Sequence, residues 1–239
     1  MLRTVGMILY VAGYLISHLP MLLKAKLLEK DPPRHQAYCR EKIVTFIRRC
    51  NKLMGMKVEM RGTENIPDCA TLTVYNHQSL LDAFVLIGHM PNTQSMVAKK
   101  ELESTPLLAS WMKAGQCIFI DRSSPRAGMA CIKKGADLLA NNVNVTIAPE
   151  GTRNNGGELL EFKAGAFKMA TRAGAPVLPV VINGTAAMFE ANGKKLRPGQ
   201  VTVTILPAIP TAGLTREEEK ALPQQVREQI RQVLEEVQQ

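Results

Sequence analysis

The sequence lacks the short motifs that mark several large classes of enzyme. It contains no GxSxG elbow, no P-loop and no GxGxxG fingerprint, which removes support for a serine hydrolase, a nucleotidase or a dinucleotide-binding enzyme. Its four histidines occur singly, without an HExxH motif or a Cys/His cluster, so we expect no metal site. The five cysteines are odd in number and have no CxxC spacing, which predicts reduced, structural thiols in a cytosolic compartment.

Aromatic residues are also scarce. They make up 5% of the 239 residues, and the excess of Lys and Arg over Asp and Glu gives a formal net charge of +9. Such a charge predicts an anionic partner, which can be nucleic acid, an anionic membrane or a phosphorylated substrate. The few aromatic residues, the lack of a nucleic-acid-binding module and the position of basic residues beside apolar helices argue against nucleic acid. We therefore expect anionic membrane lipid or a phosphorylated substrate.

The order of short apolar runs predicts the fold class. From Val58 onward, β-prone runs alternate with helical stretches, which is typical of an α/β fold. We expect a largely parallel, mixed sheet of about seven strands flanked by helices. The expected strands lie near 57–60, 70–75, 94–98, 117–120, 143–148, 177–182 and 200–206. The expected helices lie near 80–88, 105–114, 125–140, 163–173 and, after Pro223, 224–237, with Thr215 and Glu218 capping a short helix before the last one.

Residues 1–55 differ from the rest and are predicted to be a membrane-associated unit ahead of the main domain, residues 56–239. Thr4 to Leu23 form a run of 20 residues without a formal charge, long enough for one helix to cross a bilayer. Residues 35–55 have the pattern of a basic amphipathic helix, which suits the surface of anionic lipid. Together they predict a two-helix membrane anchor. In the alternative, the first run is a buried core helix and the second packs its apolar stripe on the core.

The segment Asn76–Asp82 is the first candidate for chemistry. It follows a β-prone run and precedes a helical one, so His77 is expected at the end of a strand. A neutral imidazole there can take a proton from a hydroxyl, and Asp82 can fix its tautomer through the other ring nitrogen. The alternative is structural, because Ser79 and Asp82 also match the capping pattern [ST]-x-x-[DE].

Two further strand-like runs end in polar sequences. One run ends in Asp121-Arg122 and the other in Pro149-Glu150-Gly151-Thr152-Arg153. Because ligands bind outside the carboxyl ends of strands in open α/β sheets, we expect these clusters to share one crevice with His77. Arginine is suited to bidentate phosphate binding, and a glycine lets backbone N–H groups approach an anion. The alternatives are a surface ion pair at residues 121–122 and an ordinary turn at 149–153.

In this order and spacing, four motifs resemble those of the glycerophospholipid acyltransferases, most of all the bacterial 1-acylglycerol-3-phosphate acyltransferases. The motifs are His77-x4-Asp82, Phe119-Ile-Asp121-Arg122, Pro149-Glu-Gly-Thr-Arg153 and Val177-Leu-Pro179-Val, and the resemblance covers about residues 55–210. One departure is Ala148, where the family often has an aromatic residue.

The resemblance implies roles for particular residues. It implies that His77 is the base and Asp82 its partner. It also implies that the substrate's glycerol phosphate is bound by the residues Arg122, Glu150, Gly151, Thr152 and Arg153. Lys99 stands where the family often has a phosphate-contacting lysine, although Lys100 is an alternative, since neighbouring residues of a strand face opposite ways.

The resemblance also implies an activity. An acyl group would pass from acyl-CoA or acyl carrier protein, as co-substrate and without any cofactor, to the sn-2 hydroxyl of lysophosphatidic acid, giving phosphatidic acid. The enzyme would be associated with anionic membrane lipid, with its catalytic domain on the cytoplasmic face of a bacterial inner membrane. Two alternatives are an acyltransferase for another acceptor, such as glycerol 3-phosphate, and a non-catalytic lipid-binding protein of the membrane surface.

Overall fold

A seven-stranded sheet forms the centre of the computed structural model, which describes residues 1–121 and 123–238. The strand order is β1-β7-β6-β2-β5-β3-β4, and every pair is parallel except β6 with β7. This confirms the predicted mixed, largely parallel sheet, and every expected strand is present to within a few residues. The strands are β1 (Met56–Arg61), β2 (Leu72–Tyr75), β3 (Ser95–Lys99), β4 (Ile118–Ile120), β5 (Val145–Ile147), β6 (Val177–Asn183) and β7 (Gly199–Ile205).

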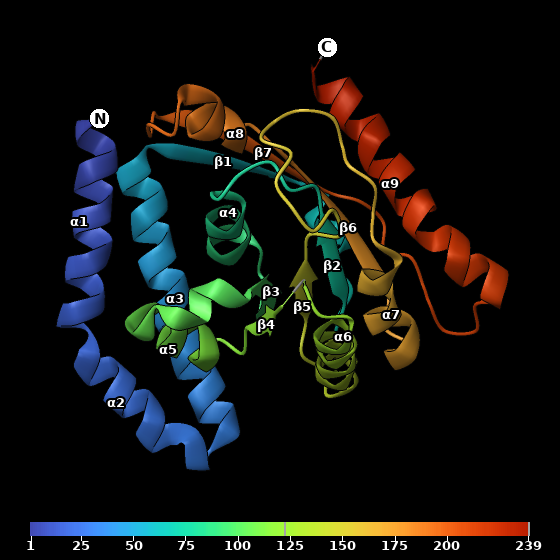
Figure 1. Cartoon of the computed structure of the whole chain (residues 1–239), viewed down its shortest axis with the longest axis horizontal. Coiled ribbons are helices and arrows are strands. Elements are labelled where there is room, and N and C mark those ends of the chain that lie inside the picture. The colour runs from blue at the N-terminus through green and yellow to red at the C-terminus, as the bar shows by residue number, and fades with distance from the viewer. Residues whose placement is uncertain (122, 239) are drawn as a thin grey trace.

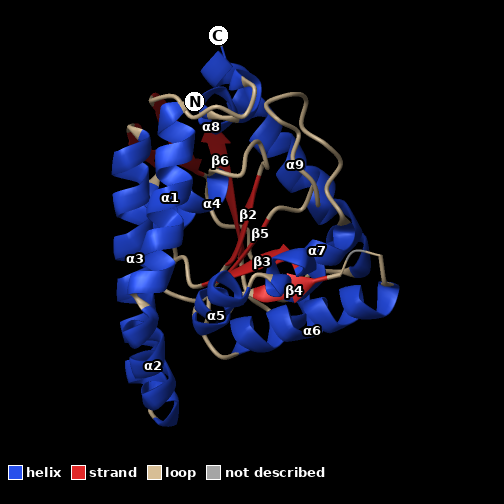
Figure 2. Ribbon diagram, turned by 60° about the vertical axis from the view of Figure 1, so that its left-hand side comes forward, coloured by secondary structure: helices blue, strands red, loops and turns tan. Residues whose placement is uncertain are grey.

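Helices cover both faces of the sheet (Figures 1 and 2). Their bounds are α1 (Leu2–Ser17), α2 (Leu19–Leu27), α3 (Pro32–Met54), α4 (Asp82–His89), α5 (Pro106–Ala114), α6 (Pro125–Ala140), α7 (Ala164–Ala173), α8 (Thr185–Met188) and α9 (Arg216–Gln238). One apolar core lies under α6, α7 and α9, and a second lies under α3 and α4. Because both faces are covered, β2 is buried at all four positions and its sequence reads as an unbroken buried strand.

The N-terminal segment is divided into two helices instead of the single one expected over residues 4–23. Helix α1 ends at Ser17 and α2 begins at Leu19, with Pro20 in its first turn, where proline needs no N–H partner. Among the described residues, no single helix is long and apolar enough to cross a membrane. The segments Leu2–Ser17 and Leu19–Lys30, which meet at a bend of 47°, meet the length and composition requirement only as a pair.

Helix α3 joins this segment to the sheet. Asp31 caps its N-terminus by accepting a hydrogen bond from the Arg34 N–H, and Gly55 ends it in the left-handed conformation with φ 71°. Its apolar stripe, which includes Cys50 and Met54, packs on the core beneath α4. This is the packing that the alternative interpretation of residues 35–55 expected.

The C-terminal helix corrects a second boundary. The sequence suggested a helix starting after Pro223 and a separate short one before it, whereas α9 runs without interruption through Pro223. The expected cap is present, but at the start of this long helix: the Thr215 hydroxyl and backbone N–H both donate to Glu218, and the Glu218 N–H donates back to Thr215 Oγ1. The helix continues because its apolar face, Leu222, Val226, Ile230 and Leu234, is buried on the same core on both sides of the proline.

Candidate active site

Strand β2 delivers His77 to the carboxyl edge of the sheet. Beyond its last residue, the Asn76 side chain continues the pairing with β6: its Nδ2 donates to the Ile182 carbonyl and its Oδ1 accepts from the Ile182 N–H, both at 2.8 Å. The Tyr75 ring meets the His77 ring edge to face, with centroids 5.8 Å apart. His77 is therefore held on a rigid backbone, while 22% of its side chain stays accessible.

Asp82 fixes the orientation of the imidazole. Its carboxylate is fully buried and accepts three hydrogen bonds: from His77 Nδ1 at 2.8 Å, from the Ser79 N–H at 2.9 Å and from the Thr185 hydroxyl at 2.6 Å. Because a carboxylate can only accept, the proton of a neutral His77 lies on Nδ1 and the lone pair on Nε2. The Ser79 N–H contact joins the two residues of the capping pattern, but Ser79 precedes α4, whose N-cap is Leu81 and has no side-chain cap hydrogen bond. Asp82 thus orients the histidine and ties the turn before α4 to the start of the helix.

Glu150 is buried and supports the backbone around His77. Only 3% of the residue is exposed, and its carboxylate accepts from the backbone N–H of His77 at 2.5 Å, from the Leu160 N–H at 3.0 Å and from Asn154 Nδ2 at 3.1 Å. The Asn154 N–H in turn donates to the His77 carbonyl at 2.8 Å. Burial raises the pKa of Glu150, while the hydrogen bonds from His77 and Leu160 oppose that rise. The structure thus joins the strand-end loops after β2 and β5, as expected of a shared crevice.

Arg153 pairs with a residue that sequence reasoning missed. Its guanidinium lies 3.1 Å from Oε1 of Glu190, whose side chain is only 5% exposed. Glu190 also accepts from the Ser79 hydroxyl and, at 2.9 Å, from the Leu80 N–H. Glu190 therefore connects the loop that carries the histidine to Arg153.

Sequence reasoning also missed Thr185, and one reason applies to both Thr185 and Glu190. Both follow β6, which lies beside β2 in the sheet. Knowing that these two strands are neighbours would have pointed to them, but one sequence does not give strand order.

A cavity of about 350 Å³ opens beside His77. At its mouth lie Gly151, Asp121 and Lys163, and its inner wall is apolar, formed by residues that include Ile147 and Met169. Gly151 has φ +74°, and a Cβ there would lie 2.8 Å from Lys163 Nζ, so glycine leaves room for the lysine. The structure thus adds Lys163 to the residues that line the cavity.

The remaining predicted residues lie farther out. Lys99 pairs with Glu101 at 2.9 Å, and Lys100 pairs with Asp121 at 3.2 Å; neither lysine lines the cavity beside His77. Hydrogen bonds from Ser123 and the Lys100 ammonium lower the pKa of Asp121 to about 2. Thr152 is exposed. Arg122 lies outside the described residues.

A sequence model of the family described as Acyltransferase matches residues 57–183, a segment that contains the histidine, its aspartate and both polar loops. The chain belongs to the acyltransferase family. The chain is similar to human 1-acyl-sn-glycerol-3-phosphate acyltransferase alpha, with 36% identity over 77% of this chain and 66% of the human protein. It thus spans slightly less than two thirds of that relative.

Two further relatives match over more of their own length. The chain is 31% identical to a probable 1-acyl-sn-glycerol-3-phosphate acyltransferase of Mycoplasma pneumoniae, over 84% of this chain and 77% of that protein. Its fold is similar to the crystal structure of the 1-acyl-sn-glycerophosphate acyltransferase PlsC of Thermotoga maritima, with a TM-score of 0.82 and 28% identity. That similarity covers 98% of this chain and 95% of the other, so it includes the N-terminal helices.

Proposed function

We propose that the protein is a 1-acyl-sn-glycerol-3-phosphate O-acyltransferase, which moves a fatty acyl group from acyl-CoA or acyl carrier protein to the sn-2 hydroxyl of lysophosphatidic acid. The observation that carries the proposal is the His77–Asp82 pair beside a cavity that has Lys163 among its lining residues and a largely apolar wall. Its relatives include proteins named for this activity. The product is phosphatidic acid.

In the proposed reaction, His77 acts as general base. Nε2 takes the proton of the sn-2 hydroxyl as its oxygen attacks the thioester carbonyl, so an ester C–O bond forms and the C–S bond breaks. The imidazolium then returns the proton to the thiolate leaving group. Asp82 stabilises the imidazolium at 2.8 Å, and general base catalysis of this kind contributes about 10²–10⁴-fold.

The basic residues around the cavity are proposed to bind the phosphate. Lys163 lines the cavity, where Gly151 leaves room for it, and Arg153 follows Gly151 in the same loop and is paired with Glu190. Arg122 and Thr152 belong to the same proposal through their motifs, with Lys99 or Lys100 farther out. Glu150 contributes indirectly, because its carboxylate is already bonded to the backbone around His77. A phosphate held in this way would place the sn-2 hydroxyl beside His77. Holding the reacting groups together lowers the free-energy barrier of the transfer.

The N-terminal helices are proposed to attach the enzyme to a membrane, because lysophosphatidic acid and its product both partition into lipid. Apolar side chains of α1 and α2 are exposed, including Ile8, Leu9 and Leu23. In this proposal residues 1–55 are the attachment unit and residues 56–239 the catalytic domain, which would face the cytoplasm from an anionic membrane.

The test is acyl transfer by the purified, detergent-solubilised protein. Labelled lysophosphatidic acid is offered with acyl-CoA and, separately, with acyl carrier protein. We expect phosphatidic acid from the wild type and a loss of about 10²–10⁴-fold in His77→Ala. His35→Ala, on α3, is the matched control and should keep full activity. Full activity in a folded His77→Ala would refute the mechanism, and a wild type inactive with both donors would refute the acceptor.

A further inference from the structure

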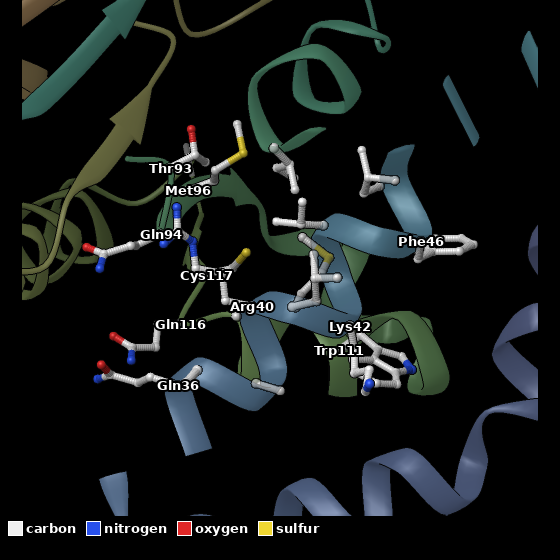
Figure 3. A pocket seen from close by; sticks show the side chains of 18 of the residues that line it. Gln36, Arg40, Lys42, Phe46, Thr93, Gln94, Met96, Trp111, Gln116 and Cys117 are labelled. Atoms are coloured by element: carbon white, nitrogen blue, oxygen red, sulfur yellow. The ribbon is translucent and has the colours of Figure 1, made fainter. Parts of the chain in front are cut away.

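A second cavity lies between α3 and α5, on the opposite edge of the sheet from His77 (Figure 3). Its volume is about 420 Å³, and we call it the α3–α5 cavity. Most of its wall is apolar and comes from Ile43, Ile47, Met96, Leu108, Trp111 and Met112. A cavity of this volume, with a mostly apolar lining, is typical of a site that binds a small, largely apolar ligand.

This cavity is separate from the candidate active site. It lies against the amino-terminal ends of β3 and β4, at Met96 and Cys117, whereas His77 follows the carboxyl end of β2. The two cavities have no lining residue in common among the described residues. A ligand in the α3–α5 cavity would therefore leave the reacting centre open.

One side of the cavity is mainly polar. In Figure 3, Gln36, Arg40, Gln94 and Gln116 lie on this side, and Phe46 and Trp111 lie on the other, together with Lys42. Arg40 is exposed and is fixed at the rim by a hydrogen bond to the Pro91 carbonyl. No acidic residue occurs among the described lining residues, while Arg40 and Lys42 are basic. This arrangement fits a molecule with an apolar chain and an anionic head.

The neighbouring surface indicates where such a molecule comes from. Helix α1 supplies Tyr14 and Leu15 to the cavity wall and packs beside α3 and α5. Most of the large apolar side chains that are exposed in the described structure lie on α1 and α2 or just before them: Met1, Leu2, Val5, Ile8, Leu9, Ile16, Leu19, Leu23 and Leu27. An apolar surface of this extent is typical of contact with a membrane. The cavity thus adjoins the surface that is suited to lipid.

We propose that the α3–α5 cavity binds one acyl chain of an anionic phospholipid of the membrane, with Arg40 beside the phosphate of its head group. The lipid is bound and not consumed, and it holds the protein at the membrane through a site distinct from the one that reacts. This goes beyond the proposed activity and does not depend on it.

The only tryptophan of the chain, Trp111, lines the cavity and serves as the reporter. Phosphatidylglycerol with brominated acyl chains is titrated into wild-type protein in non-ionic detergent, with unbrominated phosphatidylglycerol as the blank. We expect a saturable loss of Trp111 fluorescence, which unbrominated phosphatidylglycerol reverses by competition and phosphatidylcholine reverses poorly.

Two pairs of variants on α3 separate cavity binding from contact with the micelle surface. Val44 lines the cavity and Thr45 is exposed beside it, so Val44→Phe should abolish quenching and Thr45→Phe should not. Arg40→Gln should weaken binding of brominated phosphatidylglycerol several-fold and remove its advantage over phosphatidylcholine, while Arg49→Gln, at an exposed position outside the cavity, should not. If Val44→Phe does not fold, the comparison of Arg40→Gln with Arg49→Gln tests the proposal by itself.

Several results would overturn the proposal. Equal quenching in Val44→Phe and Thr45→Phe would mean that Trp111 senses only the micelle. Displacement of the brominated lipid by acyl-CoA or lysophosphatidic acid would assign the cavity to a reacting substrate, as would a changed acyl-chain preference of transfer in Val44→Phe. Because fluorescence needs no turnover, failure here is distinguishable from failure of the proposed activity.

Discussion

The carboxylate of Asp82 has one hydrogen bond that comes from far along the chain, the one donated by the Thr185 hydroxyl. Thr185 is itself fully buried, so no water replaces that hydroxyl when it is removed. The two residues begin different helices, Asp82 α4 after β2 and Thr185 α8 after β6. The position of the His77–Asp82 pair thus depends on a contact that lies outside its own motif.

Replacing Thr185 by valine should therefore lower both stability and turnover. A buried acceptor left without its donor costs about 1–3 kcal/mol, and an Asp82 that has lost the contact to its Oδ1 orients His77 less well. We expect kcat to fall with little change in KM for lysophosphatidic acid, as measured by steady-state transfer beside denaturant unfolding. Thr185→Ser keeps the hydroxyl and should restore kcat. Equal kcat in the two variants would show that the hydroxyl has no positioning role.

Hydrogen-bonding partners that are close together in the chain could be predicted from the sequence. The His77–Asp82 pair could be found because five residues from a strand end to a helix start bring the two side chains together. Glu150 was found too, but its partners were not, because they are backbone N–H groups whose positions depend on how two loops meet. Glu190 was missed because its contact with Arg153 requires the order of the strands.

Secondary structure elements were predicted well where the sequence alternates between apolar runs and turn residues. The strand boundaries could be predicted from this alternation, because the buried strands consist mostly of apolar residues and the segments between them do not. The short helix α8 was not predicted, and two helix boundaries near prolines were predicted wrongly. Pro20 lies in the first turn of α2, after a break, whereas Pro223 lies inside α9, where the helix continues because its apolar face is buried on both sides of the proline.

The start of α9 gives a prediction at this scale. Thr215 and Glu218 are exposed and cap the helix reciprocally, so Thr215→Ala should lower the free energy of unfolding by about 1 kcal/mol. Acyl transfer at low temperature should be unchanged, because the cap is remote from His77. Denaturant unfolding gives the stability, and Thr215→Asn, which also caps, should match the wild type. A stability loss in the asparagine variant equal to that in alanine would show that the side-chain cap contributes nothing.

At the scale of the whole molecule, the exposed apolar side chains are unevenly distributed. They are concentrated on α1 and α2, whereas His77 follows the carboxyl end of β2 in the sheet. The net charge of +9 suits binding to anionic lipid. At such a surface, electrostatic attraction adds to the binding free energy of apolar contact.

Changing Ile8 and Leu9 together to serine should weaken binding to vesicles that contain phosphatidylglycerol. These side chains are 63% and 66% exposed, so the change removes apolar contact with lipid and leaves the core intact. Sedimentation with vesicles measures the binding, and transfer in detergent micelles should be retained. Met129→Ser, at an exposed apolar residue of α6, is the control and should bind as the wild type does. Unchanged sedimentation of the double variant would exclude α1 from lipid contact.

The contacts that hold His77 in place also set an order of events during synthesis. The histidine is made early, but Glu150, Thr185 and Glu190, which fix its loop, follow 73 to 111 residues later than the groups they bind. The centre therefore cannot assemble on the ribosome until most of the chain has emerged. The apolar helices α1 and α2 leave the ribosome before the strands of the sheet, so a growing chain exposes these apolar side chains before the loop of His77 is held in place.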